Sequence, residues 1–142
     1  MKKRLMAIII VLLFAGIAMA GDKPHDAGRF NLYDSGSQRK GYLKRDSLFE
    51  DRTNIRSKDG ELKGWLRKDS LFEDRVNIYD SDGEQKGYLK KDSLFDDRIN
   101  IKGKAGESKG YLKKDPLFED RVNIYDSKGQ RKGYIKKDPL FK

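Results

Sequence analysis

The sequence predicts an all-β protein built from five antiparallel β-hairpins that share one hydrophobic core. The chain restarts every 23 residues, at Arg29, Arg52, Arg75, Arg98 and Arg121, and a fixed period of this length is typical of repeat architectures. Each copy contains two short runs rich in β-branched and aromatic residues, which favour strands. No copy is interrupted by an insertion, so we expect every copy to occupy an equivalent place in a symmetric or stacked structure.

The third copy shows the expected elements of one hairpin in order. Residues 75–79 form the first strand, in which Val76 and Ile78 share one face because side chains alternate with a two-residue period. The next segment, Asp80-Ser81-Asp82-Gly83, has Asp and Ser at its start and Gly at its end. That pattern favours a type I turn followed by a glycine with positive φ. Residues 85–91 form the second strand and complete a hairpin whose turn carries a bulge.

A glycine in the second strand affects how the two strands pair. It recurs in every copy, as Gly41, Gly64, Gly87, Gly110 and Gly133. A glycine inside a strand indicates either a bulge or the close approach of another backbone. Because this would be a second bulge in the same hairpin, the sequence leaves the cross-strand register open.

A short connector joins each hairpin to the next, and in the third copy it runs from Asp92 to Asp97. It begins with Asp followed by Ser, or by Pro in the cases of Pro116 and Pro139. This order resembles a helix N-cap and the first residue of a helical turn. We therefore expect one short turn, with Leu94 and Phe95 packed beneath the hairpins.

A core shared between hairpins is expected, because one hairpin alone is barely stable in water and the chain has no cysteine for disulfides. Five hairpins can pool the Leu-Phe pairs of their connectors, the aliphatic residue after each strand aromatic, and the aromatics themselves, Tyr42, Trp65, Tyr88, Tyr111 and Tyr134. The sequence favours a ring or barrel of five hairpins, and then an open antiparallel array. A parallel β-solenoid is third, because the Asp-Ser-x-Gly turn favours an antiparallel return.

The first twenty residues have the features of a secretory signal peptide. Residues 2–4 are basic, residues 5–19 are apolar except for Gly16, and Ala18-Met19-Ala20 supplies small residues for cleavage. The apolar run is shorter than the roughly 20 residues that span a bilayer, which favours cleavage over an uncleaved anchor. We expect an exported protein, periplasmic or extracellular, divided into a signal-peptide helix (1–20), a flexible linker (21–28) and a repeat domain (29–142).

The repeats also resemble a known family. The string Ile-Tyr-Asp-Ser-x-Gly-x-x-x-Gly-Tyr-Leu from Ile78 to Leu89, and its counterpart from Ile124 to Ile135, resemble the hairpin repeats of the bacterial β-flower proteins. The resemblance covers residues 29–142 and implies hairpins arranged as petals around a central axis, in a shallow barrel-like ring. It brings no established activity. The longer connector departs from the family pattern, and WG-type β-repeats are a weaker match.

The residues predict a protein that is not an enzyme. The only histidine is His25, in the linker, and there is no cysteine nucleophile or Gly-x-Ser-x-Gly elbow. Paired carboxylates such as Glu73-Asp74 recur in every connector, whereas an acid/base site needs two carboxylates in different environments. We expect these acids to form salt bridges with the arginine that follows them, such as Arg75. Asp80-Ser81-Asp82-Gly83-Glu84 has too few ligands for a calcium loop, and we expect no metal or cofactor.

Binding is the function that the composition leaves open. The net charge of +9 falls to +6 without the three bases of the signal peptide, and aromatic residues beside bases can stack on rings and meet phosphates. The candidate ligand-binding residues are Tyr42, Trp65, Tyr88, Tyr111, Tyr134, Lys86, Lys109 and Lys132. Core packing of the aromatics and a solvated lysine face explain the same spacing. We therefore expect a structural or binding module of the periplasm or cell surface. The alternative is a module that binds an envelope polyanion or glycan; a protein partner stays open, and no nucleic acid is expected.

Overall fold

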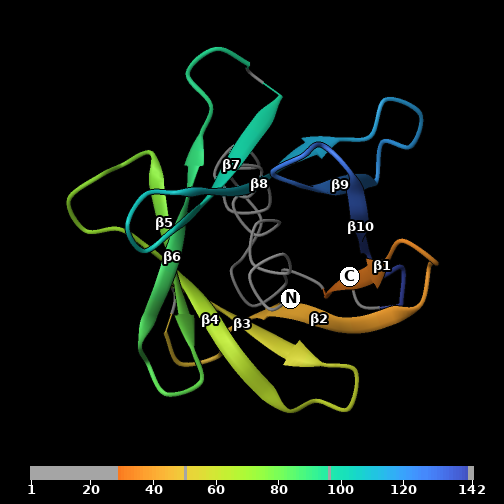
Figure 1. Cartoon of the computed structure of the whole chain (residues 1–142). Coiled ribbons are helices and arrows are strands. Elements are labelled where there is room, and N and C mark those ends of the chain that lie inside the picture. The colour runs from red at the N-terminus through yellow and green to blue at the C-terminus, as the bar shows by residue number, and fades with distance from the viewer. Residues whose placement is uncertain (1–28, 50, 96, 141–142) are drawn as a thin grey trace.

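The chain folds into ten antiparallel strands that form five hairpins. The computed structural model describes residues 29–49, 51–95 and 97–140. The strands are β1 (Phe30–Asp34), β2 (Arg39–Arg45), β3 (Arg52–Ser57), β4 (Leu62–Lys68), β5 (Arg75–Asp80), β6 (Gln85–Lys91), β7 (Arg98–Gly103), β8 (Ser108–Lys114), β9 (Arg121–Asp126) and β10 (Arg131–Lys137). The hairpins follow one another around a central axis (Figure 1).

The strands close into a barrel, as the favoured prediction required. Each strand pairs with its neighbours in sequence, and β1 pairs with β10 to complete the ring. The closing pair places Leu32 opposite Ile135, in the same register that places Leu66 opposite Ile78 between two consecutive hairpins. The open array and the parallel solenoid are therefore both wrong.

Each strand contributes one large aliphatic side chain to a buried ring. These residues are at most 2% exposed, and they are Leu32, Leu43, Ile55, Leu66, Ile78, Leu89, Ile101, Leu112, Ile124 and Ile135. A second inward layer lies two residues earlier in the first strand of each hairpin, where Val76, Ile99 and Val122 are buried. The prediction that Val76 and Ile78 share the buried face is confirmed.

The glycine of the second strand lies at both a bulge and a close backbone approach. In the third hairpin, Ile78 pairs with Gly87 and Tyr79 pairs with Gln85, so Lys86 is the extra residue. A Cβ atom on Gly87 would overlap with the carbonyl oxygen of Lys102 on the next hairpin. Both interpretations of this glycine are confirmed, and the register that the sequence left open is now defined.

The tight turns also match their prediction. The amide of Gly83 donates to the carbonyl of Asp80 at 3.0 Å, and Gly83 has a φ of +85°. The Asp80 carboxylate accepts hydrogen bonds from the amides of Asp82 and Glu84, both at 2.9 Å. The turn therefore orders the Asp80 carboxylate, which pairs with a lysine described below.

The connectors contain the expected N-cap, but their apolar residues are not in the core. Oδ1 of Asp92 accepts hydrogen bonds from the amides of Leu94 and Phe95, at 2.8 and 3.0 Å. Leu94 is nevertheless 83% exposed and Phe95 is 49% exposed, so the prediction that they pack beneath the hairpins is wrong. The inward positions are already taken by the strand residues, and the connector lies beyond the ends of the strands.

The expected signal-peptide helix and linker, residues 1–28, lie outside the described residues. Within the described ranges, no helix is long and apolar enough to cross a membrane.

Candidate functional site

The aromatic residues predicted to bind ligand or fill the core lie on the outer wall of the barrel. Trp65 pairs with Tyr79, whereas the adjacent Leu66 pairs with the inward Ile78. Since neighbouring residues of a strand face opposite sides, Trp65 points away from the core. The same holds for its counterparts, Tyr42, Tyr88, Tyr111 and Tyr134, and none of them belongs to the central hydrophobic cluster. Tyr42 and Tyr134 are nevertheless buried, at 8% and 5% exposed, but they pack on the outer side of the strands. The predicted core packing is therefore confirmed as burial for these two rings, whereas Trp65, Tyr88 and Tyr111 are only partly buried.

An arginine covers one side of each of these rings. The guanidinium of Arg75 lies 4.1 Å from the ring centroid of Tyr88 and 4.3 Å from that of the connector residue Phe72. The same sandwich recurs at Arg52, Arg98 and Arg121. Each of these arginines starts a strand, and it fixes the half-exposed phenylalanine of the preceding connector against the wall. The strict recurrence of these arginines was visible in the sequence, but it predicted salt bridges with the connector acids and not a place between two aromatic rings.

The other side of each ring faces the next hairpin. Trp65 stacks on Tyr79 at 5.8 Å between centroids, and Tyr111 stacks on Tyr125 at 4.9 Å. Tyr134 stacks on Tyr33 in the same way, at 4.9 Å. The register instead places a base opposite the other two rings, Arg56 opposite Tyr42 and Lys102 opposite Tyr88. With neighbours on both sides, these rings offer little free face for stacking on a sugar.

The three predicted lysines lie beside the tight turns, at the end of each hairpin that is opposite the connectors. Each of them is paired with an acid. Nζ of Lys86 lies 3.6 Å from Oδ2 of Asp80 and 3.4 Å from Oε2 of Glu84. Lys132 pairs with Asp126 at 3.7 Å. Hydrogen bonds from the Glu84 and Asp82 amides, together with the charge of Lys86, lower the pKa of Asp80. Glu84 in turn raises the pKa of Lys86, so this lysine stays charged and paired.

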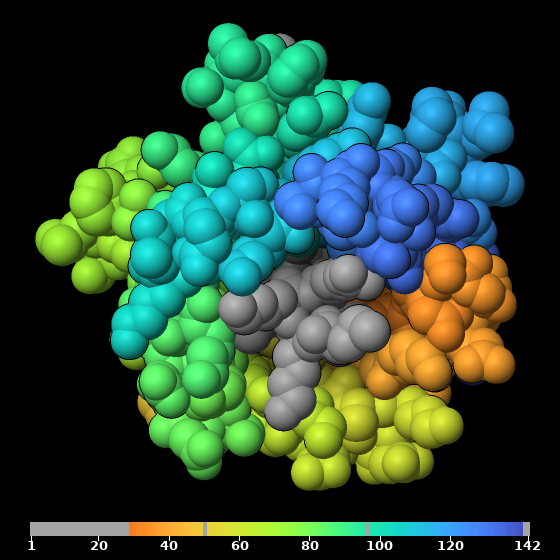
Figure 2. Space-filling model, in the orientation of Figure 1, coloured from red at the N-terminus to blue at the C-terminus, as the bar shows by residue number. Residues whose placement is uncertain are grey.

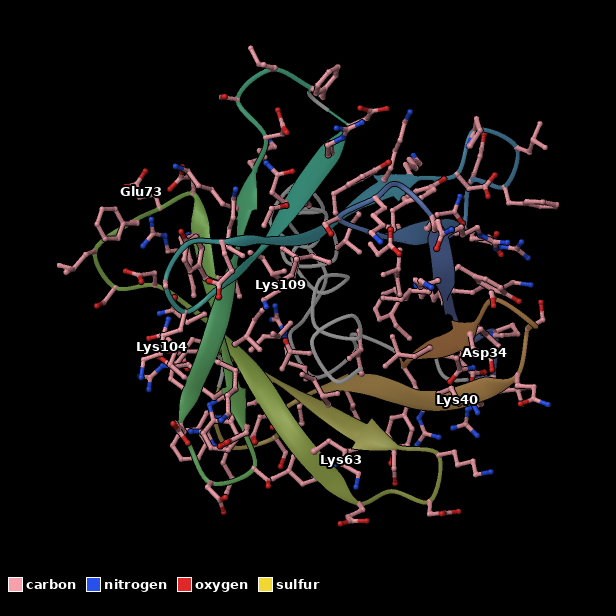
Figure 3. All side chains as sticks on the ribbon, viewed as in Figure 1. Asp34, Lys40, Lys63, Glu73, Lys104 and Lys109 are labelled. Carbon is pink, nitrogen blue, oxygen red and sulfur yellow. The ribbon has the colours of Figure 1, made fainter. Side chains whose placement is uncertain are left out.

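The alternate hairpins keep this ion pair with a different acid. The fourth hairpin has Gly103 where the third has Asp80, and its Lys109 pairs with Glu107 at 3.9 Å. A Cβ atom on Gly103 would overlap with the carboxylate of Glu107, so the glutamate occupies the space that the aspartate side chain takes in other hairpins. Figure 3 shows the corresponding pair of the first hairpin, Asp34 and Lys40, close together.

Among the described connector acids, none forms a salt bridge with the arginine that follows it, and that prediction is wrong for them. Asp51 instead accepts from Nε of Arg67 at 2.7 Å. Asp97 and Asp120 lie 3.9 Å from Lys113 and Lys136, respectively. The guanidinium groups of the following arginines lie between two aromatic rings instead.

The most unusual surface of the described molecule is a set of exposed apolar residues at the connector end. We call it the connector crown, and it consists of Leu48, Phe49, Leu71, Phe72, Leu94, Phe95, Leu117, Phe118 and Leu140. Its leucines are 83–84% exposed and its phenylalanines 49–50%. The connectors stand out from the body of the barrel as separate lobes, clearest at residues 69–74 and 115–120 (Figure 2).

A shallow basic pocket of about 160 Å³ lies on the outer wall between the first two hairpins. Its lining includes four basic side chains and one aromatic ring, Arg29, Tyr42, Lys44, Arg45 and Arg56. None of the described residues that line it is acidic. We call it the basic pocket.

The described residues contain no group of three or more His, Cys, Asp or Glu side chains that could hold a metal ion. No protein-family model, curated protein or solved structure matches the chain.

Proposed function

We propose that this protein is an exported, non-enzymatic structural module that assembles with a second copy of itself through the connector crown. The observation that carries the proposal is the exposure of the crown leucines, 83–84% in all five connectors. Each connector lobe exposes a leucine beside a half-exposed phenylalanine, and groups of exposed apolar side chains mark interaction sites.

The free energy gained by burying the crown leucines is comparable to the cost of associating two proteins. Burying a leucine side chain fully contributes about 2 kcal/mol, so five leucines from one crown contribute roughly 10 kcal/mol. Association of two proteins costs about 4–15 kcal/mol in lost freedom. The half-exposed phenylalanines add to the favourable side, because the arginine sandwich has already ordered them.

The charges around the crown favour a second copy over an anionic partner. The segment from Arg67 to Arg75, which is the second connector together with the strand ends on either side, contains three bases and three acids and has no net charge. A polyanion or an anionic membrane would attract the bases and be repelled by the acids. A second crown carries both signs beside the same apolar pair, and a two-fold interface can therefore place base opposite acid.

Export and family are part of the same proposal. The basic, apolar and small-residue segments of positions 1–20 support secretion, and the ring of hairpins supports membership among β-flower-like proteins. The absence of catalysis is supported by the repetition itself, because near-identical hairpins surround their carboxylates with near-identical groups.

The Lys-Gly-Tyr columns have less support as a site for a polyanion or glycan. Lys86, Lys109 and Lys132 are paired with turn acids. The rings beside them are covered by an arginine and by the next hairpin.

Sedimentation analysis of the exported, purified protein over a concentration range tests the proposal. We expect a reversible dimer that dissociates in the triple variant Leu71→Ser, Leu94→Ser and Leu117→Ser. These side chains are exposed, so the variant should keep the circular dichroism spectrum of the parent. The matched control carries Met at the same three positions, which keeps the apolar surface and should keep the dimer.

A folded protein that stays monomeric throughout, or a dimer that the serine variant does not weaken, would overturn the proposal. Addition of lipid vesicles to the monomer identifies the main competitor. Vesicle binding that is lost in the serine variant would assign the crown to a membrane surface instead.

A further inference from the structure

The first hairpin differs from the other four in its surroundings, and the difference creates the basic pocket. The residue before the strand arginine is aspartate in four copies, Asp51, Asp74, Asp97 and Asp120, but it is Gly28 in the first. In the second copy that aspartate pairs with the base of the wall, Asp51 with Arg67 at 2.7 Å. The first copy has Lys44 at the position of Arg67 and Gly28 at the position of Asp51. Its repeat therefore lacks the acid that would pair with Lys44.

Two further departures from the repeat place an arginine among the residues that line the pocket. Arg56 occupies the position that is tyrosine in the first, third and fifth copies, and it lies opposite Tyr42 in the barrel. Arg45 replaces the lysine that ends the second strand in the other four copies. The two gained guanidinium groups both line the pocket, and the lost acid is the one that the repeat would supply beside Lys44.

The side chains that line the pocket are held in place from several strands. The guanidinium of Arg29 lies 4.0 Å from the ring centroid of Tyr42. Nη1 of Arg56 donates to the carbonyl of Gly60, in the turn that follows β3, at 3.0 Å, and this bond orients the guanidinium. Arginine presents a planar fork of donors that matches a phosphate in two-pronged geometry.

The nearest acid in the sequence is already engaged. Asp46 accepts hydrogen bonds from the amides of Leu48 and Phe49, at 2.7 and 3.0 Å, and from Nδ2 of Asn54 at 2.9 Å. Asp46 does not line the pocket. The Leu140 amide, Asn31 and the charge of Arg29 lower the pKa of Asp138, so this carboxylate lies near one lining guanidinium, although it does not line the pocket. A ligand in the pocket meets guanidinium and ammonium groups beside an aromatic ring.

We infer that the basic pocket binds a phosphate group, carried by a small phosphate ester or by a phospholipid headgroup. Four cationic side chains and no acidic one select for a compact dianion or a diester anion over a neutral sugar. The two added arginines and the missing acid coincide at the first two hairpins alone, so we expect one phosphate group to bind at this pocket. This site does not depend on self-association through the crown.

Titration of the exported protein with inorganic phosphate and with glycerol phosphate, followed by NMR at low salt, tests the inference. The informative variant is Arg56→Tyr, because three other copies have tyrosine at this position and the fold accepts it. We expect binding to weaken by about tenfold or more, since one arginine fork is lost. The matched control is Lys102→Tyr, which removes the same charge at the equivalent position of the fourth hairpin and should leave binding within about twofold.

A second variant tests the missing acid. Gly28→Asp restores the residue that the other four copies have before their strand arginine, and we expect it to weaken phosphate binding as well. Equal losses in Arg56→Tyr and Lys102→Tyr would overturn the inference, because they would indicate non-specific attraction to a basic protein. Absence of binding to every phosphate probe would also overturn it.

Vesicles distinguish the two sources of phosphate. Zwitterionic vesicles with and without phosphatidic acid are compared for binding to the parent, to Arg56→Tyr and to Lys102→Tyr. Binding of glycerol phosphate in solution assigns a soluble ester. Binding that appears only with phosphatidic acid, and is lost only in Arg56→Tyr, assigns a lipid headgroup.

Discussion

Leu32 of the first strand lies directly opposite Ile135 of the last strand, and this pair repeats the register of Leu66 and Ile78 between the second and third hairpins. The closing contact is thus equivalent to the contacts between hairpins that are consecutive in the chain. The amide of Asp138 also donates to the carbonyl of Arg29 at 2.8 Å, as Asp69 does to Arg75 at 3.0 Å. The backbone pairing of β1 with β10 is therefore equivalent to the pairing between consecutive hairpins.

Because β1 pairs with β10 as consecutive hairpins pair with each other, truncating equivalent core residues should lower the free energy of unfolding by similar amounts. Leu32→Ala and Ile78→Ala each remove a fully buried aliphatic side chain, and each should lower the free energy of unfolding by about 2–5 kcal/mol. Urea unfolding monitored by circular dichroism measures both values. If β1 and β10 were frayed ends, Leu32→Ala would cost far less than Ile78→Ala, and closure would be refuted.

Close backbone approach predicts that the strand glycine cannot be replaced. Gly87→Ala would force a Cβ atom onto the carbonyl oxygen of Lys102, and we expect a loss of about 1–3 kcal/mol or more in unfolding free energy from overpacking. The control is Gly36→Ala, where the nearest atom to the added Cβ is Oδ1 of Asp34 at 3.5 Å. A Gly87→Ala protein as stable as the Gly36→Ala protein would contradict the packing of the two strands.

Acid should weaken the fold through the connector aspartates. Hydrogen bonds from the Leu94 amide, from Asn100 and from the Phe95 amide lower the pKa of Asp92, and the Leu117 amide and Asn123 do the same for Asp115. A lowered pKa means that the folded state binds protons less readily than the unfolded chain. This contribution to stability is therefore complete above the ordinary value near 3.8 and is lost as the pH falls through that value toward the lowered pKa.

The measurement is the urea midpoint of unfolding from pH 7 down to pH 3. We expect it to be flat near neutral pH and to fall below about pH 4. The double variant Asp92→Asn and Asp115→Asn keeps an oxygen acceptor at both N-caps but removes the titrating group. Its midpoint should depend less on pH than that of the parent, and an unchanged pH profile would exclude these aspartates as the cause.

The hairpin, its turn and the closed ring could all be predicted from the repeat, because they follow from local turn chemistry and from the need of each hairpin for neighbours. The place of the aromatics could not be read from composition, since Tyr88 and Leu89 are both apolar enough for a core. Their adjacency in one strand was the usable signal, because the two-residue period sends them to opposite faces. Leu94 was misplaced for a related reason. Apolarity indicates burial only where an inward position is free, and each strand already supplies its own inward residue.

The basic pocket was missed because the five copies were compared for what they share. It arises from what the first two copies do not share with the others, at Gly28, Arg45 and Arg56. Repeats define the scaffold through their common residues, whereas a site that occurs once must come from the differences between them.

The arginine sandwich predicts a spectroscopic effect at the second hairpin. Arg52 lies 4.3 Å from the ring of Trp65 and 4.4 Å from the ring of Phe49, and Trp65 is the only tryptophan in the chain. Arg52→Lys keeps the charge but loses the planar group that stacks on both rings. We expect a loss of about 0.5–2 kcal/mol in unfolding free energy and a change in the fluorescence of Trp65. Arg98→Lys breaks the equivalent sandwich at Tyr111 and should cost a similar amount without changing the tryptophan signal. If both variants left stability unchanged, the stacked arginines would be no more than solvated charges, and Phe49 and its counterparts would lack the support that holds them in the crown.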